Sequence, residues 1–430
     1  MCGFTISKEK LENRIKHRGV FETNISLNEW QVNFNSLPLC TYNTNLQQPL
    51  TIGSYTLCFN GEIFNYKELD NRAKSDLEYL RNFIKKYNSP EKLYKESNKW
   101  DGFWSIALVR NTKVYFFTDL LGKKQLYFNN EGISSEIKTF NNTGYLKGYD
   151  EKKFGTLNTN FDKVLRALPG VLYIYDVRND LASRLYYNRY DLKSPNENLY
   201  DIIDRSVKDR LENKYDGVSL LLSGGLDSNI ILHHALKYTD NINIISIEND
   251  EKENILKIQN DLDLKINYIN DSFTGEDLNN AVYFYEHDLD YGSLIPNYLL
   301  FKNCENSLVL TGDGSDELFG GYERNKKIDT WRYDVFQELP YYHNIRLDRM
   351  SMAFTKEARN PLMSYPLLKY SSNLNWKQRK NKQILRDCYK NILPDYITEG
   401  KKKPLRLEND KQKNMDLVKE VHRKLFKDKL

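Results

Sequence analysis

The sequence predicts two successive folds, an antiparallel β sandwich with helices (an α+β arrangement) followed by an α/β domain with a parallel sheet. Up to about residue 190, short runs that alternate in polarity or are wholly apolar are separated by turn residues, which is typical of paired strands. From about residue 200, apolar strands alternate with helical segments, which is typical of a parallel sheet covered on both faces. Residues 188–198 are polar and contain Pro195, as expected of a domain boundary. We therefore expect domains at residues 1–190 and 198–430.

The individual elements follow from these local patterns. In the first half most expected elements are strands, whereas in the second half a strand leads through a glycine-rich turn into a helix. The charged stretch after Pro404 is expected to be a frayed helix. In chain order, we expect strands at 55–59, 104–109, 114–117, 171–175, 218–222, 242–247, 264–269 and 308–310, with helices at 77–87 and 229–236.

A chain of 430 residues can bury a sizeable core, and its composition excludes several classes of partner. The 63 Lys and Arg residues nearly balance the 59 Asp and Glu residues, so the net charge of +4 gives no reason to expect nucleic acid or an anionic membrane as a partner. No apolar run approaches the roughly 18 residues that cross a membrane, and the first residues lack the pattern of a secretory signal. The five cysteines are too scattered for a disulfide framework. We expect a cytoplasmic protein.

The strongest local signal is the segment Leu-Leu-Ser-Gly-Gly-Leu-Asp-Ser at residues 221–228, between an apolar strand and a helix. Gly224 and Gly225 allow a tight turn that brings backbone N–H groups close to an anion. Ser223 and Ser228 add hydroxyl donors, and the helix N-terminus favours a pyrophosphate. The alternative is an ordinary Gly-Gly turn with a polar helix cap.

Asp227 is the unusual member of this loop, because a carboxylate beside phosphates repels them. Its presence makes sense if a Mg²⁺ ion lies between the two, since that ion prefers oxygen ligands. The loop is not a Walker A motif, because the Gly-Lys-Ser/Thr ending is absent. It resembles the pyrophosphate loop of enzymes that adenylate a carboxylate or carbonyl group.

A second glycine loop, at residues 310–322, also follows an apolar strand. Asp313, Asp316 and Glu317 bring three acidic groups into one turn, which is costly unless a cation is shared or one carboxyl holds a raised pKa. Both outcomes suit a metal and general-base site. The alternative is a solvated acidic helix cap.

The start of the chain offers a nucleophile. Cys2 follows the initiator methionine and is small enough for that methionine to be removed, which would leave a thiol and a free α-amine on one residue. The α-amine titrates at about 7.7–8.0 and the thiol at about 8.5, so the amine can accept the thiol proton. Asn60 and Gly61, in an Asn-Gly turn, are candidate donors for an oxyanion hole. The alternative is a common hairpin turn.

Together these segments resemble the glutamine-dependent asparagine synthetase family. The matching segments occur in family order and run from residue 1 to about 405, nearly the whole chain. The resemblance implies an N-terminal-nucleophile sandwich of two antiparallel sheets and an α/β domain similar to the adenine nucleotide alpha hydrolases. The segments are residues 1–4, 60–62, 75–76, 136–138, 223–228, 311–322, 356–361 and 382–386.

For the first domain, the resemblance implies a glutaminase. Cys2 would attack the side-chain amide of glutamine while Asn60 and Gly61 hold the oxyanion. Asp76 would pair with the α-amine of glutamine, with Glu62 nearby. The ammonia would then pass through an internal tunnel to the second domain.

For the second domain, the resemblance implies an ATP-dependent synthetase. ATP would be the co-substrate, with Asp227 and Asp316 holding Mg²⁺, and aspartate's β-carboxylate, in the parent enzymes, would become an acyl-adenylate. Asp313 and Lys402 would take part in catalysis, Lys402 by stabilising charge. The ATP pocket would be formed by Leu221, Ser223, Gly224, Gly225, Asp227, Ser228, Ile247, Thr311 and Gly312.

Several positions depart from the family pattern. Asn35 aligns with the arginine that grips the α-carboxylate of glutamine, and a neutral amide cannot supply a charged clamp. Asp313 stands where a glutamate is usual and is one methylene shorter. The Ser-Pro-Asp segment expected after the second strand of this domain is also missing. These changes weaken asparagine as the product more than they weaken amide synthesis through an acyl-adenylate.

The remaining features favour structural roles. The adjacent His233 and His234 point to different faces of a helix and are expected to pack rather than bind a ligand. The lysine-rich segments 377–382 and 401–403 are expected to be solvated, except for Lys402. Cysteines other than Cys2 are expected to be buried thiols.

The first hypothesis is therefore a synthetase that makes asparagine from aspartate, glutamine and ATP. A rival keeps the machinery with another acceptor: a sugar acid, a peptide carboxylate, or the ring closure of β-lactam synthetases. Intact Cys2 argues against ring closure, which needs no ammonia. Two further rivals are a nucleic-acid modifier and a non-catalytic relative. The family resemblance is also compatible with a homodimer.

Overall fold

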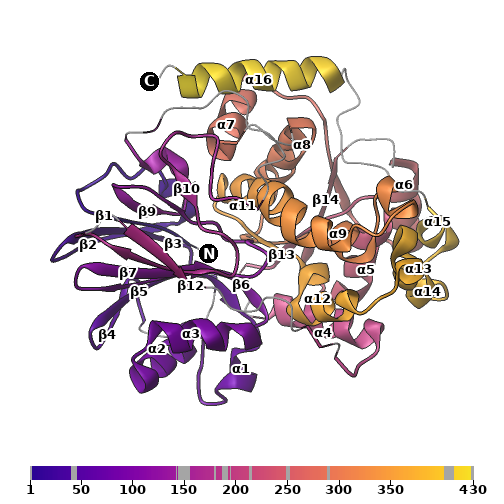
Figure 1. Cartoon of the computed structure of the whole chain (residues 1–430). Helices are drawn as coiled ribbons and strands as arrows, with labels where there is room; N and C mark the ends of the chain where they lie inside the picture. The colour runs from indigo at the N-terminus through magenta and orange to yellow at the C-terminus, as the bar shows by residue number, and fades with distance from the viewer. Residues whose placement is uncertain are drawn as a thin grey trace. The chain divides into compact units, whose positions relative to one another are not determined.

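The computed structural model describes residues 2–39, 46–141, 143, 155–178, 181–185, 192–193, 195–212, 216–247, 252–287, 291–400 and 411–427 (Figure 1). The chain forms two compact units. The first comprises Met1–Tyr190, Glu286–Asp288 and Arg423–Leu430, and the second comprises Asp191–Tyr285 and Leu289–His422. The short segments at 286–288 and 423–430 thus belong to the first unit although they follow the expected boundary.

In the part of the first unit that the structure describes, the strands form two antiparallel sheets of six strands each, so the predicted pair of antiparallel sheets is confirmed. In spatial order, one sheet comprises β10 (Leu165–Arg166), β8 (Tyr127–Phe128), β9 (Gly132–Ser134), β1 (Cys2–Ser7), β3 (Trp30–Ser36) and β2 (Phe21–Leu27). The other comprises β12 (Leu181–Leu185), β11 (Leu172–Asp176), β7 (Lys113–Thr118), β6 (Gly102–Arg110), β5 (Tyr55–Ile63) and β4 (Leu50–Ile52).

Strand alternation brings the inner faces of the two sheets together. Phe128 of β8 lies with its ring centroid 5.4 Å from that of Phe116 of β7, and 5.4 Å from that of Tyr173 of β11. Trp30 of β3 makes a similar edge contact with Tyr175, at 5.9 Å. These aromatic contacts between sheets make the first unit a sandwich.

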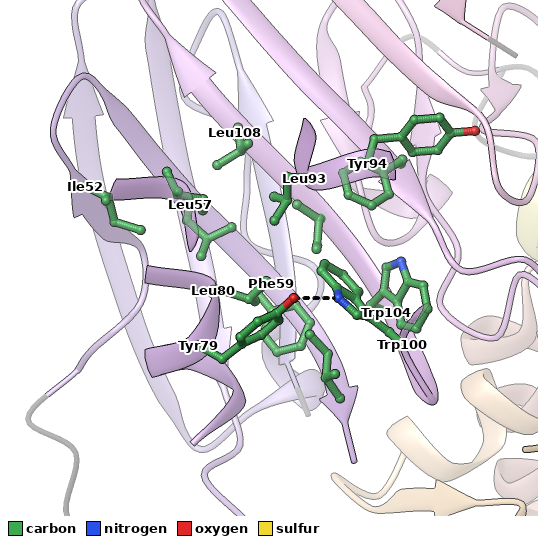
Figure 2. Close-up of a cluster of buried hydrophobic side chains, with 14 of the residues drawn as sticks. Ile52, Leu57, Phe59, Tyr79, Leu80, Leu93, Tyr94, Trp100, Trp104 and Leu108 are labelled. Atoms are coloured by element: carbon green, nitrogen blue, oxygen red, sulfur yellow. Dashed lines mark hydrogen bonds between the residues drawn. The ribbon is translucent and has the colours of Figure 1, made fainter. Parts of the chain in front are cut away.

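The opposite face of the second sheet packs on helices α2 (Asp76–Tyr87) and α3 (Pro90–Glu96), which follow α1 (Tyr66–Leu69). Alternate residues of β5, including Leu57 and Phe59, face this layer (Figure 2). The indole Nε1 of Trp100 donates to the hydroxyl of Tyr79 of α2 over 2.9 Å, which satisfies a buried polar atom within the apolar cluster.

The second unit contains a parallel sheet, as expected, and within the described residues this sheet has five strands. Its spatial order is β15 (Ile266–Ile269), β14 (Ile242–Ile247), β13 (Val218–Leu221), β16 (Leu308–Leu310) and β17 (Glu357–Arg359). The chain moves from β13 to β14 on one side and returns to β16 on the other. The carboxyl end of β13 is therefore a topological switch point, where open α/β sheets bind ligands.

Helices surround this sheet (Figure 1). Among the described residues, none of the helices is long and apolar enough to cross a membrane. They are α4 (Leu199–Leu211), α5 (Leu226–Ala235), α6 (Lys252–Asp261), α7 (Gly275–Tyr285), α8 (Tyr291–Lys302), α9 (Ser315–Phe319), α10 (Trp331–Tyr333), α11 (Asn344–Met352), α12 (Tyr365–Ser372), α13 (Trp376–Arg379), α14 (Gln383–Tyr389) and α15 (Asp395–Thr398), with α16 (Lys411–Lys427) running into the first unit.

One boundary differs from the sequence expectation in a way that affects the site. Helix α5 begins at Leu226 with Gly225 as its N-cap, not near Asn229. Asp227 and Ser228 therefore lie in the first helical turn rather than in the loop. The amide of Asn229 donates to the carbonyl oxygens of Ser223 and Gly225, which extends the helix start toward the strand.

A buried polar cluster fixes the far end of α5. His234 is fully buried, with Nδ1 2.7 Å from Asp204 of α4 and Nε2 2.6 Å from the hydroxyl of Tyr389 of α14. Asp204 also accepts from Lys237 and Tyr238, so its charge is already compensated. Burial therefore dominates and lowers the pKa of His234 to about 4.

This shift gives the stability of the protein a defined pH dependence. An unfolded histidine titrates at about 6.5, so between pH ~6.5 and ~4 the unfolded chain binds the extra proton. We expect this histidine to remove on the order of 2–3 kcal/mol of stability as the pH falls through that window. Thermal unfolding of wild type and His234→Gln should be measured across this pH window. The difference in unfolding free energy between the two proteins should become smaller toward pH 4. A difference in unfolding free energy that does not change with pH would contradict the neutral state of His234 in the folded protein.

Candidate active sites

Cys2 begins β1, and its side chain faces the inside of the sandwich. It alternates with Phe4 and Ile6, both fully buried, and is itself only 7% exposed. Its backbone N lies 3.0 Å from Oδ1 of Asn60 and donates to it. The structure thus brings together Cys2 and Asn60, which are 58 positions apart in the sequence.

The surroundings of the Cys2 thiol set its reactivity. Burial raises the pKa of this thiol, and the charge of Glu62 adds to that effect. The backbone N–H of Leu37 and the side chain of Ser36 act in the opposite sense, since both hydrogen-bond the sulfur. The thiol therefore needs a nearby base to ionise at neutral pH, and Ser36 and Leu37 are ready to stabilise the thiolate.

Asn60 and Gly61 are positioned by β5. Asn60 is fully buried on the inner face, and its Nδ2 reaches the hydroxyl of Ser105 of β6 over a long 3.4 Å. Gly61 has φ of +151°, and a Cβ there would lie 2.0 Å from the carbonyl oxygen of Phe103. Only glycine fits at this position, so the Asn-Gly pair is set by the approach of β6. It lies within a strand and not in the hairpin turn that was the alternative.

Glu62 lies in this strand, and Asp76 lies close to its end. Asp76 is the first residue of α2, and its Oδ2 accepts from the backbone N–H of Ile63 over 3.1 Å. Ser75 caps the same helix. Asp76 thereby ties the helix N-terminus to the strand end that follows Glu62, and both carboxylates can favour a cationic ligand group.

Asn35 is not brought together with Cys2. In the register of β1 and β3, Asn35 pairs with Gly3, whereas Ser36 pairs with Cys2. Its side chain therefore faces the outside of the sandwich, where it exchanges hydrogen bonds with Asn13 and donates to Asn33 over 2.9 Å.

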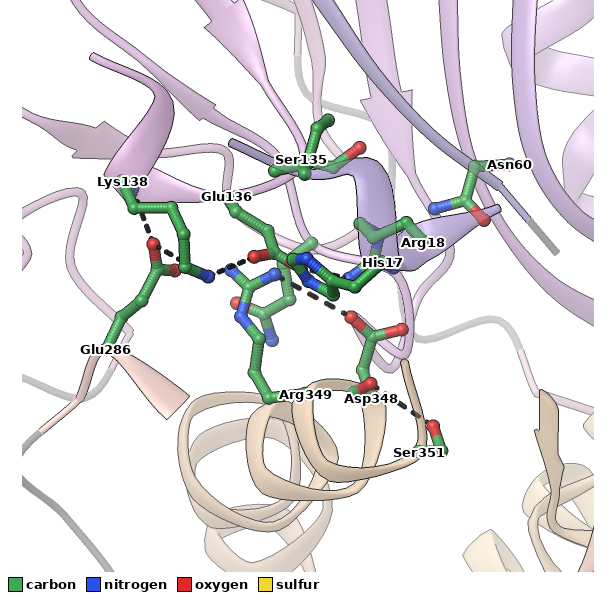
Figure 3. Close-up of polar contacts among 12 residues, drawn as sticks. His17, Arg18, Asn60, Ser135, Glu136, Lys138, Glu286, Asp348, Arg349 and Ser351 are labelled. Carbon is green, nitrogen blue, oxygen red and sulfur yellow. Dashed lines mark hydrogen bonds and ion pairs between the residues drawn. The ribbon is translucent and has the colours of Figure 1, made fainter. Parts of the chain in front are cut away.

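A buried ion network joins Arg18 to three further charged residues, Glu136, Lys138 and Glu286 (Figure 3). The Nε of Arg18 donates to the carbonyl of Cys2 over 3.2 Å, and its Nη1 pairs with Glu136 at 2.7 Å. Glu136 also pairs with Lys138, whose ammonium lies 3.4 Å from Glu286. Because Arg18 is held by Glu136, it is not placed to replace the arginine clamp that is missing at position 35.

Lys138 is the cation between two buried carboxylates, so its removal should be costly. We expect Lys138→Met to destabilise the protein by about 3–5 kcal/mol, because Glu136 and Glu286 would face one another without it. Calorimetry should show a lower melting temperature, partly restored by adding Glu286→Gln. Lys113→Met, at an exposed pair with Asp176, should change stability by less than about 1 kcal/mol. Equal effects of the two lysine changes would contradict the role of Lys138.

In the second unit, the first glycine loop is closed by its own serines. The backbone N–H of Ser223 donates to the hydroxyl of Ser228 over 3.0 Å, and the N–H of Gly225 donates to the hydroxyl of Ser223. Gly224 lies between them, at the amino end of α5. The loop thus presents hydroxyl groups and a helix N-terminus at the carboxyl end of β13, which suits a phosphate group.

Asp227 and Asp316 face the same cation. The ammonium of Lys382 pairs with Oδ2 of Asp227 and lies 2.5 Å from Oδ1 of Asp316. Ser315 donates to the other oxygen of Asp227 over 2.8 Å. Lys382 is 4% exposed, so the expectation that this lysine is solvated was wrong. Its two carboxylate partners retain it in the interior.

The other acidic residues of the second glycine loop have separate partners. Asp313 accepts from Nη2 of Arg346 over 3.3 Å. Glu317 is buried and accepts from the hydroxyl of Tyr322, with Nε2 of His343 at 3.3 Å. Burial raises the pKa of Glu317. The sequence predicts a shared cation or a raised carboxyl pKa among these three acids. In the structure, Asp316 shares Lys382 with Asp227 of the first loop, and Glu317 is the carboxyl whose pKa is raised.

The expected ATP-contacting residues gather at one edge of the parallel sheet. Leu221 and Ile247 end β13 and β14, and Thr311 follows β16. A Cβ on Gly312 would lie 3.1 Å from the backbone N of Ser228, so the two glycine loops touch. Lys402 lies outside the described residues.

The donor set at Asp227 and Asp316 fits a magnesium ion that also binds phosphate. Two carboxylates supply oxygen ligands, and Mg²⁺ usually completes its shell with water and substrate phosphates. Within the described ranges, no cluster of three or more His, Cys, Asp or Glu side chains suits a metal ion. The two carboxylates would thus hold magnesium only together with another ligand.

The cysteines are free thiols where the structure describes them. Cys58 and Cys304 are buried as expected, whereas Cys388 is only partly buried. Cys40 lies outside the described residues.

Comparisons with known proteins agree with this arrangement. A family model described as "Glutamine amidotransferase domain" matches residues 5–163, and one described as "Asparagine synthase" matches residues 198–340 and 331–430, together more than half of the chain. The chain is 25% identical over 423 residues to a Mus musculus protein named "Asparagine synthetase [glutamine-hydrolyzing]" and 23% identical over 418 residues to the Homo sapiens protein of that name. Each match covers 81% of this chain and 72% of the relative.

Proposed function

Since this chain belongs to the asparagine synthetase family of ATP-dependent, glutamine-hydrolysing ligases, we propose that it makes asparagine from aspartate, glutamine and ATP, releasing glutamate, AMP and pyrophosphate. The observation that carries the proposal is the hydrogen bond from the backbone N of Cys2 to Asn60, which joins the residue that bears the buried thiol to the Asn-Gly pair of β5, in the same chain as the two glycine loops. The relatives share only about a quarter of its residues, so the acceptor and the mechanism are inferred from the site.

In the first unit, removal of Met1 turns the nitrogen of Cys2 into an α-amine held by Asn60. This amine takes the thiol proton, because the buried thiol ionises poorly by itself. The thiolate attacks the amide carbon of glutamine, and the protonated α-amine returns its proton to the leaving nitrogen, so that ammonia departs and a thioester forms. Water then hydrolyses the thioester to glutamate and restores the thiol. Gly61 N–H and the Asn60 amide, released from Ser105, stabilise the oxyanion. Asp76 and Glu62 bind the α-ammonium of glutamine.

In the second unit, an oxygen of the β-carboxylate of aspartate attacks the α-phosphorus of ATP, and pyrophosphate leaves. Ser223, Gly225 and Ser228 bind the phosphates, and Leu221, Ile247, Thr311 and Gly312 line the nucleotide pocket. Magnesium, held by Asp227 and Asp316 with the phosphates, would neutralise charge on the leaving pyrophosphate. Ammonia then attacks the acyl carbon, AMP leaves with one carboxylate oxygen, and Asp313 accepts a proton. Lys402 is proposed to stabilise the developing charge.

The site also favours one second candidate, the same chemistry on another carboxylate. Asp313 is shorter than the glutamate usual in the family and is held by Arg346, so the acceptor side of the site differs from the family pattern. Amino-acid analysis after incubation with ATP, glutamine and aspartate separates the two candidates. Asparagine formation supports the first, whereas pyrophosphate release only with another acid supports the second.

A further inference from the structure

Lys382 occupies the place between the two carboxylates that we assign to magnesium. Its ammonium lies against Asp227, in the first turn of α5, and Asp316, in the first turn of α9. The lysine itself comes from the turn that precedes α14. Three segments far apart in the sequence therefore meet at one buried positive charge.

The backbone at Lys382 has an unusual conformation that directs its side chain toward the two carboxylates. Asn381 and Lys382 are both left-handed, with φ of 55° and 57°, a conformation that costs of order 1 kcal/mol or more for each non-glycine residue. A Cβ on Gly321 would lie 1.7 Å from Oδ1 of Asp316 and 2.3 Å from Cε of Lys382. Glycine at this position therefore leaves room for the two side chains to meet in the arrangement that the structure shows.

A lysine ammonium and a hydrated magnesium ion compete for the same oxygens. Both are attracted to the pair of carboxylates, and like charges so close repel one another. If magnesium bound without nucleotide, it would displace the ammonium of Lys382 from both carboxylates. The buried positive charge of the lysine would then lose these two partners, which is costly. A triphosphate changes this balance, because its oxygens bind both cations.

We propose that Lys382 is an exchangeable counter-ion of the magnesium site, an inference that rests on the proposed function. Without nucleotide it neutralises Asp227 and Asp316 and weakens metal binding. When ATP binds, the ammonium transfers to the phosphate oxygens and the two carboxylates turn to the metal. Metal binding at this site is thereby made conditional on the nucleotide.

The proposal is tested by titrating the full chain with Mn²⁺, with and without ATP. Electron paramagnetic resonance measures how much Mn²⁺ is bound. Wild type should bind Mn²⁺ at least ten times more tightly in the presence of ATP than in its absence. Lys382→Met should bind Mn²⁺ alone at least ten times more tightly than wild type and should bind ATP more weakly. Lys380→Met, at an exposed neighbouring lysine, should behave as wild type.

The outcomes separate the inference from the function on which it rests. Tight binding of Mn²⁺ alone by wild type would overturn the inference, even if Lys382→Met fails to fold. Equal affinity of Lys382→Met and wild type for Mn²⁺ alone would also overturn it, while ATP-dependent Mn²⁺ binding leaves the proposed function standing. Failure of wild type to bind Mn²⁺ even with ATP would overturn the metal site and this inference with it.

Discussion

Replacement of Cys2 by alanine is expected to lower glutamine-dependent synthesis by at least about 10³-fold and to leave ammonia-dependent synthesis within about twofold of wild type. The thiol is the only group at the start of β1 that can form the thioester, whereas the nucleotide residues lie in the other unit. The measurement is the rate of pyrophosphate release and asparagine formation with each nitrogen donor.

Cys58→Ala is the matched control for this change. Cys58 is also a buried thiol on the inner face, two residues before Asn60, but it lies inside β5 and has no terminal amine. We expect it to retain glutamine use. Retention of glutamine-dependent synthesis by Cys2→Ala would show that the nucleophile has been wrongly assigned.

Replacement of Asp227 by asparagine is expected to lower aspartate-dependent exchange of pyrophosphate into ATP by about 100-fold or more, while glutaminase activity stays within about twofold. The amide keeps the size of the side chain and its contact with Ser315, but it removes one of the two anionic metal ligands. The comparison of the two half-reactions isolates the loss to the second unit.

Asp240→Asn serves as the control, since Asp240 is exposed and lies beyond the carboxyl end of α5, whereas Asp227 is in its first turn. Its exchange rate should equal that of wild type. If Asp227→Asn keeps full exchange activity, the carboxylate does not hold a catalytic metal and the site needs another assignment.

The local patterns of the sequence predict eight of the seventeen strands that the structure describes. Runs such as those at β5, β6 and β7 are apolar or alternating because their two faces contact the other sheet and a helical layer. The Gly-Gly loop was found for the same reason, since its turn is set by neighbouring residues. The start of α5 was placed three residues too late, because Asp227 and Ser228 have polar side chains that are equally common in loops.

Features that depend on tertiary contacts could not be predicted. The polar, lysine-rich sequence around Lys382 also contains exposed lysines such as Lys380 and does not distinguish it from them. Lys382 is buried because its ammonium meets the first turns of α5 and α9. The contact of Arg18 with the Cys2 carbonyl and the position of Glu286 beside Lys138 likewise join distant segments. Asn35 shows the converse, because an alignment fixes its position in the chain but not the face of the strand to which its side chain points.

The central claim is that nitrogen freed at Cys2 replaces an oxygen of an AMP-activated acid. Its most direct test is mass spectrometry of one reaction that contains ATP, glutamine labelled with ¹⁵N in its amide and aspartate labelled with ¹⁸O in its β-carboxylate. We expect equal amounts of ¹⁵N-labelled asparagine and ¹⁸O-labelled AMP. Asparagine without ¹⁵N, or ¹⁸O in inorganic phosphate with ADP as the nucleotide product, would contradict it.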